Sequence, residues 1–443
     1  EETLNGPRSL GSEDDRLIHD RIRKAVSGHE GPTVVIGGPP CQAYSLVGRS
    51  RNRGISDYRP ETDHRHYLYR EYLRVLESVE PEVFIMENVK GILTSRVDGQ
   101  RIFPKIREDL ENPGNALGNG PSKGYRLYPL TGLTLDEFGD ELPADDSGFV
   151  IRAEDYGVPQ ARHRVIVLGV REDLEDGAQD RPLLDSGNIF GPVTAEEVLA
   201  DLPPLRSGLS KQTDSFEAWL GALRSGQASI LGALDGMPGA QAKARETAQG
   251  LLKDLGRGGN FVPSVFRVTQ MPRELGDWFR DPFLHGYLNH ETRSHMTEDL
   301  HRYLFASCYA ASADGISPRT SDYPASLIPA HKSWSTGNFA DRFRVQARNR
   351  VPSTVTSHIA KDGHYFIHYD PLQCRSLTVR EAARIQTFPD NYYFWGGRTQ
   401  QYTQVGNAVP PFLARNIAKT VYGILRLNFS LEASERVKAE VAE

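Results

Sequence analysis

The sequence has little cysteine and no long apolar run. Only three cysteines occur among its 443 residues, at Cys41, Cys308 and Cys374, and their wide spacing matches no zinc-binding motif. A chain with so few cysteines does not depend on disulfides, so we expect a reducing, cytoplasmic setting. No apolar stretch approaches the roughly 18 residues that a membrane-spanning helix needs, so we expect no membrane association. Hydrophobic residues still make up 38% of the chain, which favours a globular protein with a large core.

The chain also lacks an overall positive charge. Its formal net charge of −6 argues mildly against a nucleic-acid partner. The charge is unevenly distributed, however, because residues 331–375 carry seven Lys or Arg against three Asp. Three further arginines follow Cys41 closely, at Arg49, Arg51 and Arg53. Local basic faces of this kind can still follow a phosphate backbone, although residues 46–61 could equally be a solvated linker.

The cysteine at position 41 lies in an unusual turn. Residues 37–42 read Gly-Gly-Pro-Pro-Cys-Gln and follow the apolar run Thr33–Ile36, which is β-branched and bounded by Pro32. This pattern predicts a buried strand that delivers Cys41 in a stiff turn, beside two glycines that allow backbone to approach a ligand. The alternative is that Cys41 is a small buried hydrophobic side chain.

A second strand end carries a carboxylate. Residues 66–79 have the periodicity of a helix, and Val83–Met86 predicts another buried strand that leads directly into Glu87. A strand, a helix and a parallel strand form a right-handed crossover, so both strands should end at one rim of the sheet. Cys41 and Glu87 can therefore lie close together. The alternative for Glu87 is a helix cap or an ordinary ion pair.

Two arginines lie on a third extended segment. Strands are predicted at residues 149–152 and 164–170, and the link between them ends in Gln160-x-Arg162-x-Arg164. Side chains at i and i+2 on extended backbone point to the same side, so we expect Arg162 and Arg164 to act together. The alternative is a pair of surface salt-bridge partners.

The region from about residue 182 to 371 has weak periodicity and no repeat, whereas regular patterns return at its end. Thr378 and Glu381 form a capping box that predicts a helix. The segment Gly406-Asn407-Ala408-Val409 then leads into a helix that begins near two prolines. We therefore interpret the middle region as a domain inserted into the first one.

Four elements follow one another along the chain, namely the Pro-Pro-Cys-Gln turn, Glu87 after a strand, Gln-x-Arg-x-Arg and Gly-Asn-x-Val. In this order they resemble the DNA (cytosine-5)-methyltransferase family of bacterial restriction-modification systems. The resemblance covers about residues 33–170 and 373–425. It implies transfer of a methyl group from S-adenosylmethionine to carbon 5 of a flipped-out cytosine in a specific duplex DNA sequence. The transfer would pass through a covalent adduct between Cys41 and carbon 6 of the base. Two alternatives remain, a cytosine-5 methyltransferase that acts on tRNA and a catalytically inactive DNA-binding relative.

The resemblance also assigns roles residue by residue. Cys41 would be the nucleophile, Glu87 would protonate or hydrogen-bond N3, Arg164 would hold O2, and Arg162 would support the site. The methyl donor would be bound by Pro40, Leu68, Asn407 and Val409. DNA would be contacted by Gln42, Ser45 and Arg348, the last within a basic segment at 342–368 that could instead be a structural sheet with solvated arginines. No metal is expected.

The expected fold is α/β, a doubly wound Rossmann-like methyltransferase domain with a smaller inserted target-recognition domain. We place the catalytic domain at 1–180 and 373–427, the inserted domain at 181–372 and a polar tail at 428–443. The family's opening strand and aromatic-x-Gly-x-Gly loop are not found before Thr33. We therefore expect a catalytic domain that lacks its N-terminal donor-binding part in this chain, or that receives it from a second polypeptide. The expected partners are duplex DNA and, by genetic association, a restriction endonuclease. We expect a monomer near the nucleoid of a bacterium or in a phage-infected cell.

Overall fold

The computed structural model describes residues 15–29, 31–39, 69–97, 99–131, 146–174, 184, 190–252, 255–264, 270–329 and 342–442. The chain forms two compact units. The first unit comprises Glu1–Arg152, His163–Ser186 and Asn416–Glu443. The second unit comprises Ala153–Arg162 and Gly187–Arg415.

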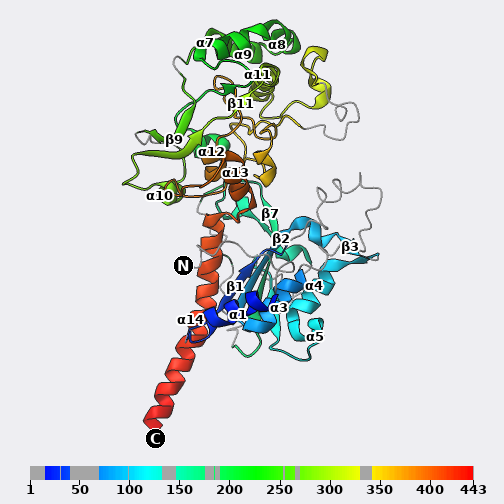
Figure 1. Cartoon of the computed structure of the whole chain (residues 1–443), viewed down its shortest axis with the longest axis vertical. Coiled ribbons are helices and arrows are strands. Elements are labelled where there is room, and N and C mark those ends of the chain that lie inside the picture. Colours follow the sequence, from blue (N-terminus) through cyan, green and yellow to red (C-terminus); the bar gives the residue numbers. More distant parts are fainter. Residues whose placement is uncertain are drawn as a thin grey trace. The chain divides into compact units, whose positions relative to one another are not determined.

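A five-stranded sheet forms the centre of the first unit (Figure 1). Strands β1 (Val34–Gly37) and β2 (Val83–Val89) run parallel and are joined through helix α3 (Tyr69–Val79). Strand β7 (His163–Arg171) pairs antiparallel with β2, and β5 (Tyr125–Tyr128) and β6 (Val150–Arg152) pair antiparallel with β7. The predicted crossover between β1 and β2 is therefore confirmed. The sheet as a whole is mixed, because β7 reverses direction.

One face of this sheet packs against helices α3 and α4 (Ile102–Glu111). The alternate residues Phe84 and Met86 of β2 join a core that includes Leu76 of α3 and Ile106 of α4. The period of two along β2 therefore directs Glu87 to the opposite face. The other elements of the first unit are α1 (Asp15–Val26), the 3₁₀ turns Lys90–Leu93 and Asp146–Phe149, β3 (Arg96–Val97), β4 (Gln100–Arg101), α5 (Pro113–Leu117) and the later part of α14 (Pro411–Ala442).

The second unit combines helices with short strands and irregular segments, in keeping with the weak periodicity of its sequence. Helix α6 (Ala195–Leu199) begins behind a capping box formed by Thr194 and Glu197. The capping box at Thr378 is confirmed as the start of α12 (Val379–Ile385). The remaining elements are β8 (Gly208–Leu209), α7 (Phe216–Ser225), α8 (Gln227–Ala233), α9 (Pro238–Gln249), β9 (Gly258–Pro263), α10 (Arg273–Phe279), β10 (Gly286–Glu291), β11 (Ser294–His295), α11 (Thr297–Ser312), α13 (Arg398–Asn407), the 3₁₀ turns Ala153–Tyr156, Thr320–Asp322, Ala325–Leu327 and Ser357–Ala360, and the start of α14.

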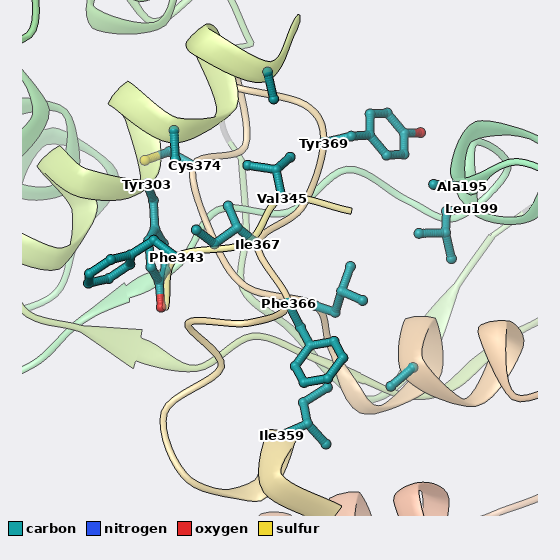
Figure 2. Close-up of a cluster of buried hydrophobic side chains, with 14 of the residues drawn as sticks. Ala195, Leu199, Tyr303, Phe343, Val345, Ile359, Phe366, Ile367, Tyr369 and Cys374 are labelled. Atoms are coloured by element: carbon teal, nitrogen blue, oxygen red, sulfur yellow. The ribbon is translucent and has the colours of Figure 1, made fainter. Parts of the chain in front are cut away.

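The core of the second unit gathers side chains from irregular segments as well as from helices (Figure 2). Tyr303 of α11 lies with its ring centroid 6.3 Å from that of Phe343, which precedes the bridge between Val345 and Ile367. These non-helical segments are fixed by burial of alternate apolar residues, which is why helical periodicity was absent from their sequence.

Helix α12 is buried along its whole length, and its charged side chains are paired inside the unit. Arg375, just before the helix, donates to both carboxylate oxygens of Glu381 at 2.6 Å. Arg384 forms ion pairs with Asp201 at 3.0 Å and with Asp390 at 2.6 Å. Charges removed from water are tolerated only when they are paired and hydrogen-bonded, so these contacts fix α12 in one orientation.

Three buried histidines surround this ionic cluster. Burial lowers the pKa of His290 and of His368 to about 4 and that of His295 to about 3. Arg375 adds to the effect at His368. His290 is neutral in the fold, where its ring nitrogens lie 3.0 Å from the Thr378 hydroxyl and 2.9 Å from the Pro203 carbonyl.

Acid should therefore destabilise the second unit in a defined pH window. The native pKa values lie below the unfolded value near 6.5, so the unfolded chain binds protons that the native chain does not. Stability is fully present above pH 6.5 and is lost as the pH falls toward about 4, by up to about 1.4 kcal/mol per pH unit for each histidine. Urea unfolding at a series of pH values measures this slope. An unfolding free energy that stays constant between pH 6.5 and 4.5 would contradict it.

Candidate active site

The end of β1, where the turn begins, packs against a buried tyrosine of α3. A Cβ atom at Gly37 would lie 2.6 Å from the Tyr72 ring, so only glycine fits there. The Tyr72 hydroxyl donates a hydrogen bond to the Ile85 carbonyl on β2 at 3.0 Å. Burial raises the pKa of Tyr72, so this hydroxyl remains a donor. The end of β1 is thereby held against β2.

A buried asparagine holds the next part of the turn. Asn88 Nδ2 donates to the Pro39 carbonyl at 3.2 Å, while its Oδ1 accepts from the Val89 amide at 2.9 Å. The backbone that leads to the predicted nucleophile is therefore fixed as far as Pro39. The predicted site residues Pro40, Cys41, Gln42, Ser45 and Leu68 lie outside the described part of the chain.

Glu87 and Arg164 form an ion pair on the sheet face opposite the α3–α4 core. In the β2–β7 ladder Arg164 lies opposite Val89, two residues beyond Glu87 and on the same face. Long side chains reach such a diagonal neighbour, and Arg164 Nε lies 3.0 Å from Glu87 Oε1. The Arg164 side chain is 17% exposed and that of Glu87 23%, so both remain accessible to a ligand.

The turn also passes close to Glu87. A Cβ atom placed on Gly38 would lie 3.3 Å from Glu87 Oε2. The two strand ends therefore meet as the crossover predicted. Gly38, Glu87 and Arg164 form a site at this rim that presents a carboxylate and a guanidinium side by side.

The other predicted arginine belongs to the second unit. Arg162 is 3% exposed and its Nη1 donates to the Val355 carbonyl at 2.9 Å. Gln160 of the same motif is also buried, where its Oε1 accepts from the Val355 amide at 2.7 Å and its Nε2 donates to the Ile385 carbonyl at 3.2 Å. Both side chains thus anchor residues 153–162 within the second unit. A supporting role for Arg162 in catalysis remains a prediction.

The predicted donor residues lie at the end of α13, since Asn407 is its last residue and Val409 lies two residues beyond. Gly406 packs so closely that a Cβ atom would lie 2.2 Å from the Ser357 amide nitrogen. The Gln386 amide donates to the carbonyls of Val405 and Ala408, at 3.0 and 2.6 Å. These contacts fix the backbone and leave the Asn407 side chain exposed and Val409 half-buried.

Arg348 is exposed but already carries partners. It pairs with Glu196, and its guanidinium lies 4.8 Å from the centre of the Tyr369 ring. Its neighbour Arg350 pairs with Asp314 at 3.3 Å. The basic segment 342–368 is therefore partly neutralised within the second unit.

Nothing in the described ranges suggests a metal centre or a membrane segment. No three or more His, Cys, Asp or Glu side chains gather there in an arrangement that could hold a metal ion. No helix there combines the length and the apolar composition needed to cross a bilayer.

Comparison with protein-family models shows which family the chain belongs to. The model of the C-5 cytosine-specific DNA methylases matches residues 14–117, 144–215 and 284–423, which is most of the chain. The chain belongs to this family. The DNA (cytosine-5)-methyltransferase identity that the motifs predicted is thus confirmed, as is the α/β methyltransferase fold class.

Curated relatives agree with the family match. A type II methyltransferase of Bacillus paralicheniformis is 35% identical over 88% of this chain and 70% of its own length. A type II methyltransferase of Thalassovita gelatinovora is 27% identical over 88% of this chain and 82% of its own. A DNA (cytosine-5-)-methyltransferase of Aeropyrum pernix is 26% identical over 88% of this chain and 81% of its own.

Sequence reasoning did not identify the residues that position the site of this methylase. Tyr72 lies within the helix predicted at 66–79 and Asn88 directly follows Glu87, but no separate role was predicted for either residue. A signal was available for Asn88, because a polar residue directly after a buried strand must satisfy its amide locally. No sequence signal indicated that Tyr72 lies beneath Gly37.

Replacing Asn88 with alanine should release the backbone at Pro39 without creating a cavity in the apolar core. The change removes both hydrogen bonds of a buried amide and should lower the unfolding free energy by about 1–3 kcal/mol. Asn119→Ala is the matched control, because its amide donates to Glu77 at an exposed position in the same unit. Urea unfolding compares the two variants. Equal stabilities would show that the Asn88 contact to Pro39 contributes nothing.

Proposed function

We propose that this methylase transfers the methyl group of S-adenosylmethionine to carbon 5 of a flipped-out cytosine in duplex DNA, through a covalent bond between Cys41 and carbon 6. The observation that carries the proposal is the Glu87–Arg164 pair, held beside the turn that leads to Cys41. The family match supports cytosine C5 in DNA as the position that is methylated.

A cysteine is suited to this reaction because carbon 5 alone is too weakly nucleophilic. When the Cys41 thiolate adds to carbon 6, the electron pair of the C5–C6 double bond moves into the ring and makes carbon 5 an enamine-like nucleophile. Carbon 5 then takes the methyl group, while the electron pair of the broken sulfur–methyl bond stays on the donor's sulfur. Loss of the proton from carbon 5 to solvent restores the double bond and expels the thiolate, so the cysteine is regenerated.

Glu87 and Arg164 match the polar edge of the base. Arginine offers several donors to the O2 carbonyl, whereas a carboxylate accepts from the N4 amino group of cytosine. A protonated Glu87 can also donate to N3, where negative charge develops when the thiolate adds. Because the Glu87 carboxylate and the Arg164 guanidinium lie side by side, they favour a ligand that presents a hydrogen-bond donor and an acceptor along one edge.

The residues that would hold the methyl donor fit its mixed chemistry. Asn407 offers an exposed amide that makes no hydrogen bond within the described residues, and Val409 offers a half-buried apolar side chain. Pro40 and Leu68 are the other two residues that the resemblance assigns to donor binding. S-adenosylmethionine supplies an electrophilic methyl group, and the chain's own residues position the base that receives it.

The second unit would recognise the DNA sequence, with Gln42 and Ser45 contacting DNA beside the flipped base. Extrusion of the base costs a few kcal/mol, which protein–DNA contacts must supply. Since relatives are named type II methyltransferases, a restriction endonuclease that cuts the same sequence is the expected genetic partner.

Duplex DNA containing 5-fluorocytosine should trap the chain covalently when S-adenosylmethionine is present. Fluorine cannot leave carbon 5 as a cation, so the Cys41–C6 bond should persist. Cys41→Ser should form no adduct. Glu87→Gln should slow its formation by about a hundredfold or more, as removal of a general acid does. Denaturing gels and intact mass measure the adduct.

Two results would contradict the proposed roles of Cys41 and Glu87. Adduct formation by the Cys41→Ser variant would remove Cys41 from the mechanism. An unchanged rate for Glu87→Gln, with the same unfolding midpoint as the wild type, would remove Glu87.

Arg348→Ala should weaken duplex DNA binding and lower the dependence of log affinity on log salt by about one unit, if Arg348 contacts a phosphate. Glu196→Gln is the matched control, because it frees the Arg348 guanidinium and should leave the slope unchanged or steeper. Filter binding over a range of salt concentrations measures both. An unchanged affinity and slope for Arg348→Ala would place Arg348 outside the interface.

A further inference from the structure

A loop in the second unit holds its backbone rigidly while it exposes aromatic rings. Residues 392–397 connect the α12 region to α13, and the exposed Tyr392, Tyr393 and Trp395 flank the buried Phe394 in sequence. Phe394 is fully buried, whereas the Trp395 side chain is 78% exposed and Tyr393 is 42% exposed. The centroids of the two outer rings lie 6.1 Å apart.

Six backbone polar groups of this loop are hydrogen-bonded by side chains. Asn289 of β10 accepts from the Phe394 amide at 2.9 Å and donates to the Phe394 carbonyl at 3.2 Å. Gln404 Nε2 donates to the Trp395 carbonyl and Gln401 Nε2 to the Gly396 carbonyl, each at 2.9 Å.

Two further contacts complete this fixation. Gln400 accepts from the Gly397 amide at 2.8 Å, and Arg380 donates to the Tyr392 carbonyl at 2.5 Å. The entropy of ordering the loop is therefore already lost in the free chain, which is the condition for a preorganised binding surface.

The tryptophan at this position differs from the others in the described part of the chain. Trp219 is buried, and Trp278 packs against Phe412 with ring centroids 5.5 Å apart. A single exposed aromatic ring is common on protein surfaces. Here, however, side chains fix the backbone at residues 394–397, and holding an exposed ring in one place in this way does not contribute to folding. The arrangement favours contact with a flat ligand.

A polar pocket adjoins the same loop at Gly396. Its volume is about 160 Å³, and its lining is mainly polar, with side-chain amides, a carboxylate and a guanidinium. Arg398 pairs with Glu291 at 2.7 Å, and both are more than a third exposed. Asn260 of β9 is exposed and also lines the pocket. The other polar lining side chains are Asn289 and Gln401.

This combination matches a nucleobase. Aromatic faces stack on bases of any sequence, and asparagine, glutamine, arginine and glutamate are the side chains that recognise base edges. We propose that Trp395, with Tyr393, is a stacking platform for an unpaired base of the DNA substrate, whose polar edge enters the pocket beside Gly396. The proposal rests on DNA being the substrate, and it adds a second base-binding site to that of the flipped cytosine.

The test compares two duplexes that differ in one nucleotide. One duplex carries a single bulged thymine and the other an abasic residue at the same position. The wild-type chain should bind the thymine duplex about five- to a hundredfold more tightly, the range expected for one stacked base. Trp395→Ala should abolish this preference, Trp395→Phe should retain part of it, and Gln404→Ala should reduce it because it frees the Trp395 carbonyl.

Two controls separate this platform from the fold and from the catalytic site. Tyr422→Ala removes another exposed aromatic, 66% exposed on α14, and should leave the preference intact. Glu87→Gln should also keep it, because Glu87 belongs to the site for the flipped cytosine. Loss of the preference in Glu87→Gln but not in Trp395→Ala would overturn the proposal, and so would equal binding of both duplexes by the wild type.

Methyl incorporation into unmethylated DNA is measured in parallel with the same preparations. Methyl transfer without a base preference overturns the stacking platform and leaves the proposed function standing. A Trp395-dependent preference without methyl transfer supports the platform and argues against the proposed function.

Discussion

The pairing register of β2 with β7 is the constraint on which the catalytic rim depends. It places Arg164 opposite Val89, so that its side chain reaches Glu87 diagonally on the face away from the α3–α4 core. A slip of one residue would move Glu87 into that core and direct Phe84 outward. Burial of Phe84 and Met86 therefore does more than stabilise the sheet, because it selects the face on which the carboxylate and the guanidinium meet.

The two units use different means to hold their functional segments. In the first unit, apolar packing sets the register, and hydrogen bonds of Tyr72 and Asn88 hold β2 and the backbone at Pro39. In the second unit, short helices and irregular segments are held by buried polar contacts, above all those of Arg375 and Arg384 around α12. Directional contacts of this kind can fix a loop that has little regular structure, and the loop of Trp395 is held in the same way.

The parts of the fold that could be predicted are those encoded by patterns of neighbouring residues. The β1–α3–β2 crossover and the capping box at Thr378 are local patterns, and both are confirmed. The direction of β7 could not be predicted, because an alternating strand is the same whichever way it runs. Helix α9 of the second unit was missed, since its buried face consists mainly of small residues such as Ala240 and Ala244, which give little hydrophobic contrast. The predicted roles of Cys41 and Arg162 came from motif order and remain predictions.

The account's central claim is that Glu87 and Arg164 act as one unit on one edge of the cytosine ring. A double-variant cycle in methyl transfer tests it directly, with Glu87→Gln, Arg164→Lys and the two combined. Residues that act as a unit are strongly non-additive. The account predicts that the double variant is about as slow as the slower single variant. Rate losses that multiply would contradict it, because they would show that the two side chains act independently.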